Sequence, residues 1–349
     1  MRHDEINLIS DTITRPTQPM LEAMMKARVG DDVFGADPTA IELQEKIADI
    51  FDVEAALFFP SGTMANQTAI KLHTQPGEQL ICDKWAHVYN YEGGGASFNS
   101  GVSCKLIDGH RGMFTAEQVA QNVNNPSDYH QALTRLVAVE NTTNKGGGAC
   151  WDFDELVSIG EVSRAHGLGY HLDGARLFNA LVAKGEDPKA YGRLFDTISI
   201  CLSKGLGAPV GSVLLSNRET IDRAVRIRKL FGGAMRQIGY LAAAGIYALD
   251  HHVERLQEDH LRAKILGKAL EDCPFVRKVE PVETNILIFN LKEGIDEAKF
   301  LEHMAERNIL MINLGPGKLR MVTHLDFTDE MLQEVIQALE QMEVEKIKS

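Results

Sequence analysis

The chain has 349 residues, 44% hydrophobic and 24% charged, which suits a globular protein of one large domain or two domains. Its 49 acidic residues outnumber its 36 lysines and arginines, so the net charge is −13, which argues against partners such as nucleic acid or an anionic membrane. Five scattered cysteines without CxxC spacing argue against disulfides and a cysteine zinc site, and we expect no metal. We expect a cytoplasmic protein, because the N-terminus lacks a signal-peptide core and no apolar run approaches the roughly 20 residues of a membrane span.

Short apolar runs alternate with helical patterns along most of the chain. The first run, 55–59, ends at Pro60-Ser61-Gly62 and precedes a helical pattern over 63–72. This alternation predicts an α/β fold with a mostly parallel central sheet covered by helices on both faces. The other strand-like runs are 79–83, 104–107, 135–140, 169–173, 197–202 and 211–215.

The pattern changes after residue 217. Residues 217–272 are almost wholly helical in character, and shorter alternating segments follow them. We therefore predict a large α/β domain over residues 1–250 and a small C-terminal α+β domain over residues 251–349. The later segments read as strand, helix, strand, strand and helix, and they are 285–291, 296–307, 309–313, 319–323 and 329–346.

Lys204 follows an apolar run and stands among small residues in the segment Ser203–Pro209 (SKGLGAP). Charged side chains usually avoid the end of a buried strand, so a lysine here is a candidate nucleophile that forms a Schiff base. The alternative is an ordinary lysine that faces solvent at the strand end.

Asp173 ends another apolar run in the segment His171–Arg176 (HLDGAR). We expect Asp173 and Lys204 to lie at neighbouring carboxyl ends of strands, where open α/β sheets bind ligands. A carboxylate there can pair with the protonated ring nitrogen of pyridoxal phosphate (PLP), which lets the ring accept electrons. The alternatives are a helix N-cap for Asp173 and a surface position for Arg176, which otherwise points toward the same site.

Two further segments suggest binding of a phosphorylated heterocycle. Gly62 and Thr63, in the strand–helix junction Ser61–Asn66 (SGTMAN), offer backbone N–H groups to a phosphate monoester. His87 follows the run 79–83, and its imidazole can stack on a flat ring. The alternatives are a tight turn with an N-cap for the first segment and an ordinary core or surface histidine for the second.

These four segments occur in the order found in fold-type I PLP enzymes. The chain as a whole resembles the threonine aldolases of the β-eliminating lyase family over about residues 6–340. One departure is ENTTN at 140–144, where many aldolases have ENTHN. The matching segments are SDTITRPT (10–17), GDDVFGADPTAIELQ (30–44), HLDGARLFNA (171–180), SKGLGAPVGS (203–212), RKLFGGAMRQ (228–237) and RMVTH (320–324).

The resemblance implies how the cofactor PLP is bound. Lys204 would form the Schiff base, Asp173 would pair with the ring nitrogen, and His87 would stack on the ring. Gly62 and Thr63 would bind the phosphate.

The resemblance also implies substrate contacts. Arg176 would lie near the ring hydroxyl and the substrate carboxylate. Ser10 and Arg320 would bind the carboxylate of the amino acid, because arginine offers a two-pronged donor for that anion. Tyr91 lies where relatives have an aromatic residue near the side-chain pocket.

Three further residues complete the implied site. Lys229 and Arg236 would approach the cofactor site of a neighbouring subunit, and the family implies a homotetramer built from dimers. His130 matches a histidine near the substrate hydroxyl, so His130 and His87 are the candidates for the general base.

The function implied is cleavage of the Cα–Cβ bond of L-threonine or L-allo-threonine to glycine and acetaldehyde. The alternatives are another PLP-dependent lyase or an aminotransferase, and a regulatory protein of the same fold. We expect structural roles for Asp31 and Asp32, as a turn and helix cap, and for His251, His252 and His260, on a solvated helix face.

Overall fold

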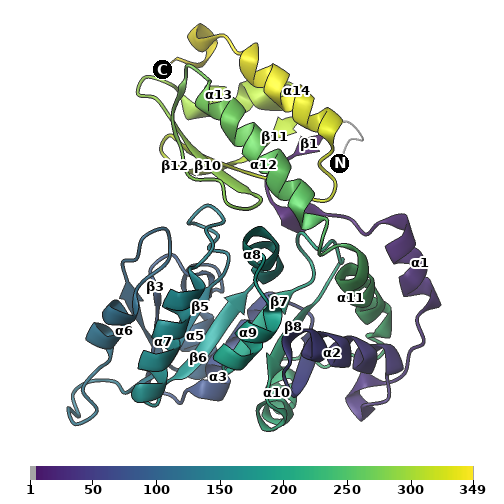
Figure 1. Ribbon diagram of the computed structural model, residues 1–349, viewed down its shortest axis with the longest axis vertical. Helices are drawn as coiled ribbons and strands as arrows, with labels where there is room; N and C mark the ends of the chain where they lie inside the picture. Colours follow the sequence, from purple (N-terminus) through teal and green to yellow (C-terminus); the bar gives the residue numbers. More distant parts are fainter. Residues whose placement is uncertain (1–4, 349) are drawn as a thin grey trace.

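Seven strands form the central sheet of the larger part of the molecule (Figure 1). The computed structural model describes residues 5–348. The strands are β2 (Ala55–Phe59), β3 (Gln79–Asp83), β4 (Ser103–Ile107), β5 (Thr134–Glu140), β6 (Gly169–Gly174), β7 (Thr197–Cys201) and β8 (Ser212–Ser216). Their order is β2-β8-β7-β6-β5-β3-β4, and β8 runs antiparallel to both of its neighbours while the others are parallel. The predicted, mostly parallel sheet is confirmed.

Helices cover both faces of this sheet because its strands are apolar on both faces. Alternate residues of β5 enter different core clusters: Val137 and Val139 pack in one, Leu136 and Ala138 in another. The helices are α1 (Gln18–Lys26), α2 (Pro38–Phe51), α3 (Gly62–His73), α4 (His87–Asn90), α5 (Gly95–Ser100), α6 (Ala116–Asn122), α7 (Phe153–Ala165), α8 (Leu177–Lys184), α9 (Pro188–Leu194), α10 (Arg218–Leu230) and α11 (Gly239–His251). Two 3-10 helices, η1 (Asp11–Ile13) and η2 (Asp32–Phe34), lie near the N-terminus.

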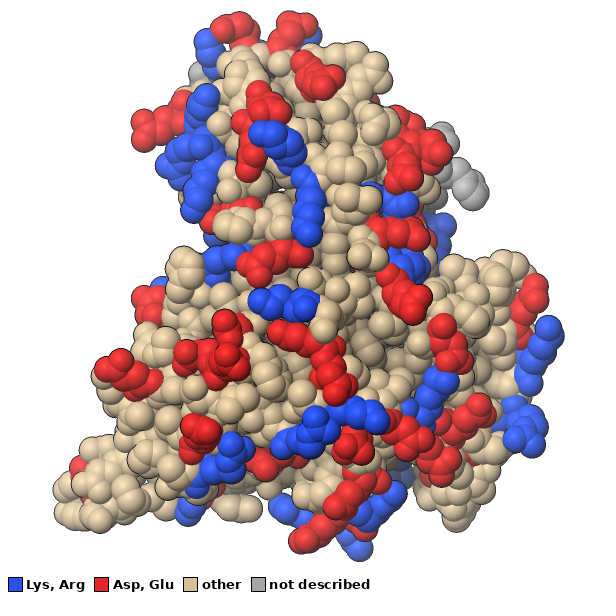
Figure 2. Space-filling model, in the orientation of Figure 1, with Lys and Arg blue, Asp and Glu red and all other residues tan. Residues whose placement is uncertain are grey.

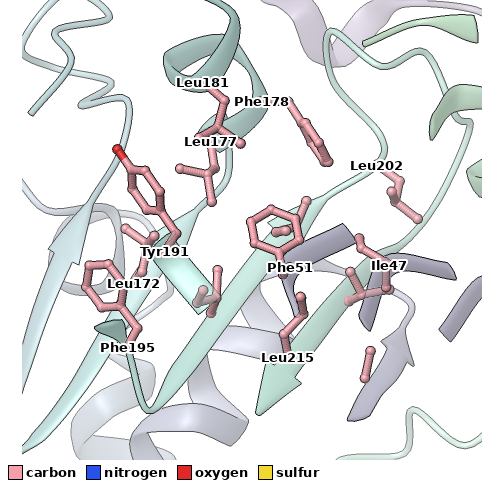
Figure 3. Packing of buried hydrophobic residues seen from close by; sticks show 14 of the residues in the cluster. Ile47, Phe51, Leu172, Leu177, Phe178, Leu181, Tyr191, Phe195, Leu202 and Leu215 are labelled. Atoms are coloured by element: carbon pink, nitrogen blue, oxygen red, sulfur yellow. The ribbon is translucent and has the colours of Figure 1, made fainter. Parts of the chain in front are cut away.

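The largest core cluster lies between the sheet and helices α2, α8 and α9 (Figure 3). Phe51 of α2 meets Phe178 of α8 edge to face, with ring centroids 5.8 Å apart. Tyr191 and Phe195 close the other side of the cluster against Leu172 of β6. This packing fixes β6 and β7 relative to each other, and their carboxyl ends carry Asp173 and Cys201.

The C-terminal part has its own sheet and core above the large sheet (Figure 1). Its strands β9 (Val276–Val279), β10 (Ile286–Leu291), β12 (Ile312–Gly315) and β13 (Lys318–Val322) pair antiparallel in the order β12-β13-β10-β9. Its helices are α12 (Leu256–Glu271), α13 (Glu297–Ala305), α14 (Asp329–Glu340) and the 3-10 helix η3 (Val344–Ile347).

The N-terminal strand β1 (Ile6–Asn7) lies with the C-terminal part. It pairs in parallel with β11 (Ile309–Leu310), and Ile6 and Leu8 pack in the C-terminal core. The division into residues 1–250 and 251–349 stays a prediction, and β1 shows that the chain crosses between the two cores near both ends.

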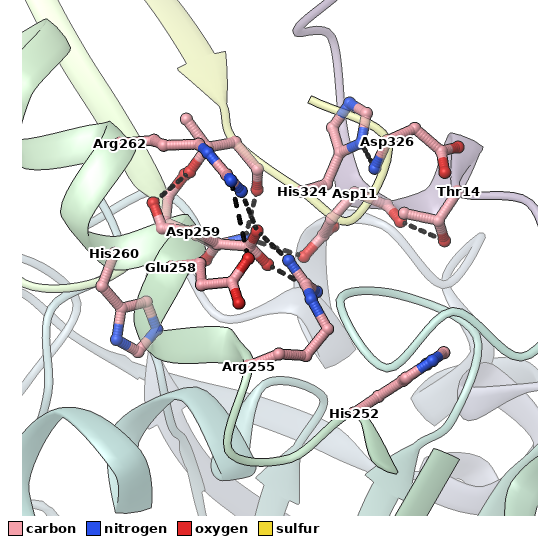
Figure 4. Close-up of polar contacts among 12 residues, drawn as sticks. Asp11, Thr14, His252, Arg255, Glu258, Asp259, His260, Arg262, His324 and Asp326 are labelled. Carbon is pink, nitrogen blue, oxygen red and sulfur yellow. Dashed lines mark hydrogen bonds and ion pairs between the residues drawn. The ribbon is translucent and has the colours of Figure 1, made fainter. Parts of the chain in front are cut away.

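Helix α12 connects the two cores. Leu256 belongs to the large core, whereas Leu266 and Leu270 belong to the C-terminal core. Between them Asp259 is buried and pairs with Arg255, with Nη2 and Oδ1 2.5 Å apart (Figure 4). Burial raises the pKa of Asp259, although the positive charge of Arg255 opposes this.

The expectation of a solvated histidine face was wrong for two of the three histidines. His252 is buried, and its Nδ1 lies 2.7 Å from the carbonyl oxygen of Leu206. His260 is also buried, with Nε2 3.2 Å from the amide nitrogen of Asn179. His252, the C-cap of α11, therefore contacts the segment after β7, and His260 joins α12 to α8.

The molecular surface carries both signs of charge. Figure 2 shows acidic and basic side chains interspersed on one face. Among the described helices, none combines the length and the apolar character needed to span a bilayer.

Candidate active site

A cavity of about 320 Å³ lies where the carboxyl ends of β6 and β7 meet the N-terminus of α3. Five of the eight residues expected to contact the cofactor line this cavity. They are Gly62, Thr63, His87, Asp173 and Lys204.

Lys204 lies in the turn that follows β7. The Oγ1 of Thr14 donates to the carbonyl oxygen of Lys204 at 3.0 Å, and the N–H of Gly207 donates to the same oxygen at 2.8 Å. These bonds hold the backbone, while the half-buried Nζ lies 3.6 Å from the sulfur of Cys201. Sulfur is a weak acceptor, so the amine is not committed to a strong partner there.

Asp173 is buried at the end of β6, with 2% of its surface exposed. Its Oδ1 accepts from the backbone N–H of Ala175 at 3.1 Å, and its Oδ2 accepts from the side chain of Asn66 at 3.0 Å. The following helix α8 begins at Leu177 with Arg176 as its N-cap, so Asp173 is not a helix N-cap. Its carboxylate is instead presented to the cavity.

His87 begins α4 and is surrounded by carboxylates. Its Nδ1 lies 2.9 Å from Oε1 of buried Glu92, and its backbone N–H donates to Glu140 at 2.8 Å. Burial alone would lower the pKa of His87, but the hydrogen bond to Glu92 and the charge of Asp173 raise it overall. One ring nitrogen of His87 and one carboxylate oxygen each of Glu92 and Asp173 lie within 4.8 Å of one another. Two carboxylates this close make this end of the cavity attractive to positive charge.

Glu140 is the third carboxylate around His87. It lies at the end of β5, next to Asp173 on β6. Burial and the charge of Asp173 raise the pKa of Glu140 to about 7. Hydrogen bonds from the backbone N–H groups of Asn144 and His87 lower this pKa but do not cancel the rise. A neutral Glu140 reduces the repulsion among three carboxylates that face one another.

The opposite end of the cavity is suited to an anion. Helix α3 begins at Gly62, and the Oγ of Ser61 caps it by accepting from the N–H of Met64 at 3.2 Å. The first N–H groups of a helix have no partner within it and bind phosphates readily. A Cβ at Gly62 would come 2.7 Å from the sulfur of Cys201, so a larger residue there would require the side chain of Cys201 to move.

Arg176 and Asp11 form a buried ion pair beside the cavity. The guanidinium Nε and Nη2 of Arg176 donate to the carboxylate of Asp11 at 2.7 and 2.5 Å. Burial would raise the pKa of Asp11, but Arg176 holds it at about 2. Two guanidinium donors are thus committed to Asp11, and the predicted contact between Arg176 and a substrate carboxylate stays a prediction.

Arg320 of β13 is buried, and one of its three guanidinium nitrogens has no hydrogen-bond partner among the described residues. Its Nη1 donates to the side chain of Asn144 at 2.8 Å, and its Nη2 donates to the carbonyl oxygen of Ile9 at 3.0 Å. Within residues 5–348, its buried Nε has no hydrogen-bond partner. Burial and the nearby charge of Arg176 lower the pKa of Arg320 to about 10. A carboxylate would satisfy the free donor and offset the repulsion between the two arginines.

Ser10 and Tyr91 are the other predicted substrate contacts. The Oγ of Ser10 accepts from the N–H of Thr12 at 3.2 Å and thereby caps η1. The ring of Tyr91 is half-exposed and its centroid lies 5.6 Å from that of His87. Tyr91 is therefore near the cavity wall, whereas a substrate contact by Ser10 stays a prediction.

Seven of the predicted residues are not among those that line the cavity: Arg176, Arg320, Ser10 and Tyr91, described above, and His130, Lys229 and Arg236. His130 is exposed in the loop before β5, and its ring contacts that of Tyr129, with centroids 4.0 Å apart. Lys229 is exposed at the end of α10, and Arg236 pairs with Asp31 at 2.8 Å. Their roles stay predictions.

The residues present fit PLP. The cavity offers a helix N-terminus for the phosphate, an imidazole at its wall, a buried carboxylate for the ring nitrogen and a lysine amine. Glu92, Glu140 and Asn66 were missed as site residues, although Glu140 and Asn66 lie in the ENTTN and SGTMAN segments. Glu140 had a sequence signal, a carboxylate at the end of an apolar run, whereas Glu92 and Asn66 had none.

Comparison with known proteins agrees with this geometry. The family model described as beta-eliminating lyase matches residues 7–293. The low specificity L-threonine aldolase of Escherichia coli (strain K12) is 45% identical over 95% of this chain and 97% of its own length. The low-specificity L-threonine aldolase 1 of Arabidopsis thaliana is 39% identical over 93% of this chain and 92% of its own.

Solved structures share the fold. A threonine aldolase of Leishmania major superposes with a TM-score of 0.85 at 22% identity, covering 96% of this chain and 99% of its own. A serine palmitoyltransferase of Sphingomonas wittichii reaches 0.73 at 17% identity, covering 96% of this chain and 86% of its own. The sequence matches go further than the fold, and they show that the chain belongs to the beta-eliminating lyase family, alongside the low-specificity L-threonine aldolases.

Proposed function

We propose that this protein is a PLP-dependent carbon–carbon lyase that cleaves L-threonine and L-allo-threonine to glycine and acetaldehyde. The observation that carries the proposal is one cavity lined by Lys204, Asp173 and the N-terminus of α3. These groups place an amine, a carboxylate and a phosphate site around one cavity of about 320 Å³. The names of the two relatives point to L-threonine as a substrate.

The cofactor would be held by Lys204 through its amine, by Asp173 at its ring nitrogen and by Gly62 and Thr63 at its phosphate. His87 would stack on its ring. When bound, PLP supplies an electron sink that stabilises negative charge at Cα after the Cα–Cβ bond breaks. The buried carboxylate of Asp173 would hold a proton at the ring nitrogen, which strengthens that sink.

The carboxylate of the amino acid would be bound by Arg320, with Arg176 and Ser10 nearby. The free Nε of Arg320 is the donor that supports this assignment. Fixing the carboxylate orients the Cα–Cβ bond, because rotation about the bond to the amine determines which bond at Cα is weakened.

Removal of the proton from the β-hydroxyl needs a base, and the candidates are His87 and His130. His87 lines the cavity and is held through its Nδ1 by Glu92, which leaves Nε2 for substrate or water. This geometry favours His87. Tyr91 beside it would border the pocket for the substrate side chain.

We further propose a cytoplasmic homotetramer, built from dimers, that takes part in threonine catabolism and glycine formation. Lys229 and Arg236 would reach the site of a neighbouring subunit, which their exposure permits. The main alternative activity is that of another PLP-dependent lyase or an aminotransferase, which would use the same Lys204 and Asp173.

The test is product analysis on PLP-loaded protein. With L-threonine or L-allo-threonine, acetaldehyde and glycine should form in equal amounts, and the Lys204→Ala variant should form neither. A 2-oxo acid without aldehyde would identify an aminotransferase and contradict the proposal.

A further inference from the structure

Asn66, near the start of α3, makes four hydrogen bonds while only 2% of its surface is exposed. Its Nδ2 donates to Oδ2 of Asp173 at 3.0 Å and to Oε1 of Glu92 at 2.9 Å. Its Oδ1 accepts from the hydroxyl of Ser199 at 2.6 Å and lies 3.1 Å from Nε2 of His171. One amide group therefore uses its full hydrogen-bonding capacity beside the cavity.

The orientation of this amide follows from its partners. An ionised carboxylate only accepts hydrogen bonds, so the NH₂ group must face Asp173 and Glu92. The oxygen then faces Ser199 and His171, which can both donate. A flipped amide would set an oxygen against two carboxylates and leave both donors unpaired, which is costly for buried groups.

A chain of buried groups reinforces this orientation. Burial lowers the pKa of His171 to about 4, so its ring is neutral and carries one N–H. The Nδ1 of His171 lies 2.9 Å from the Oγ1 of Thr197 and 3.2 Å from the carbonyl oxygen of the same residue. The oxygen of Asn66 needs a donor, which places the N–H on Nε2, and Nδ1 then accepts from the hydroxyl of Thr197. His73 in turn has its Nε2 3.0 Å from the same Oγ1. Each donor points toward the carboxylates, and such aligned bonds strengthen one another.

We propose that Asn66 is a positioning residue that holds the carboxylate of Asp173 oriented toward the ring nitrogen of the cofactor. The same amide ties Asp173 to Glu92 and, through Glu92, to His87. The side chain of Asn66 thus helps to fix the positions of both Asp173 and His87. The inference rests on the proposed cofactor site and assigns the residue that prepares it.

The test uses the purified enzyme loaded with PLP that is isotopically labelled at its ring nitrogen, whose NMR signal reports protonation of that atom. The variant is Asn66→Leu, which has similar volume and no donor. The matched control is Gln67→Leu, because Gln67 is equally buried and donates to Glu92 at 2.5 Å but not to Asp173. PLP affinity is measured in parallel by equilibrium titration of the cofactor-free proteins.

In Asn66→Leu the ring nitrogen should lose its proton at a pH lower by roughly one unit or more, because the carboxylate of Asp173 is no longer held facing that atom. PLP affinity should fall about tenfold. Gln67→Leu should keep the wild-type titration. In an Asp173→Asn background, Asn66→Leu should cause little further loss of affinity, since the two residues act through one contact.

A ring-nitrogen titration in Asn66→Leu that matches Gln67→Leu would overturn the inference. Should Asn66→Leu fail to fold, as judged by the thermal transition of the cofactor-free protein, Asn66→Ala should show the same direction of shift, and an unshifted titration in it would overturn the inference equally. The proposed function fails separately, if wild-type protein binds no PLP or releases no aldehyde.

Discussion

The buried pair of Asp11 and Arg176 shows how strongly a neighbouring charge changes the pKa of a buried carboxyl. Asp11 has a pKa of about 2 in the folded protein, against an ordinary value of 3.8. A carboxyl with a lowered folded pKa contributes stability above its unfolded pKa, and this contribution is lost as the pH falls through the folded pKa. The shift corresponds to about 2 kcal/mol, present above roughly pH 4 and lost toward pH 2.

We therefore expect Asp11→Asn to flatten the dependence of unfolding free energy on pH between roughly pH 4 and pH 2. It should also destabilise the protein at neutral pH, because Arg176 is left buried without its anion. Urea unfolding at a series of pH values measures both effects. Parallel curves for wild type and variant over this range would show that Asp11 titrates normally.

Arg320 provides a second prediction at the residue scale. Arg320→Ala should weaken threonine binding by roughly tenfold or more, because a charge-assisted contact to a carboxylate is lost. PLP binding should change much less. Both affinities can be measured by titration of wild type and variant, and an equal loss of both would assign Arg320 a structural role.

Single residues differed in how far the sequence could predict them. Lys204 and Asp173 were identifiable because a charged residue directly after a buried strand is conspicuous, and parallel strands bring their carboxyl ends together. Glu92, Asp11 and Asn66 were not, since their importance comes from partners distant in the sequence: Asn66 and Asp173 are 107 positions apart. No local pattern marks such a contact.

At the scale of elements, two ion pairs join the loop around η2 to the region of α10. One pair reaches α10 and is buried, and the other reaches the segment after α10 and is exposed. Asp32 and Arg228 are both buried and lie 2.8 Å apart, whereas Asp31 and Arg236 lie 2.8 Å apart near solvent. Arg228 also donates to the carbonyl oxygen of Phe58 in β2 at 2.7 Å. The predicted structural role of the two aspartates is supported, since Asp31 caps η2 by accepting from Val33.

Replacing the two aspartates should have unequal effects. Asp32→Asn should destabilise the protein by roughly 3–5 kcal/mol, because Arg228 stays buried without a counter-charge. The matched change Asp31→Asn keeps a cap and should cost under about 1 kcal/mol, because solvent screens the exposed pair. Urea unfolding of the two variants decides this, and equal losses would refute the assignment.

Most elements were predictable because burial on both faces makes parallel strands continuously apolar. The run over 217–272 is mostly helical in the structure as well. It was expected to be almost wholly helical, and the structure divides it into α10, α11 and α12. The pairing of β1 with β11 could not be predicted, because two residues carry no period and their partners lie about 300 positions away.

At the scale of the whole molecule, the proposal that Lys229 and Arg236 reach the site of a neighbouring subunit requires these side chains to be exposed, as they are. We expect a mixture of Lys204→Ala and Arg236→Ala, each inactive alone, to regain part of the activity. Subunit exchange would create one site with both lesions and one with neither. Aldehyde release after exchange, with mixed dimers verified by mass, measures this, and no recovery would refute a shared site.

The account rests above all on Lys204 as the residue that binds the cofactor. The most direct test is reduction of the PLP-loaded protein with borohydride, followed by proteolysis and mass spectrometry of the labelled peptide. The account predicts one phosphopyridoxyl group on Lys204, with none on the Lys204→Ala variant treated in the same way. A label on another lysine, or an equally labelled variant, would contradict it.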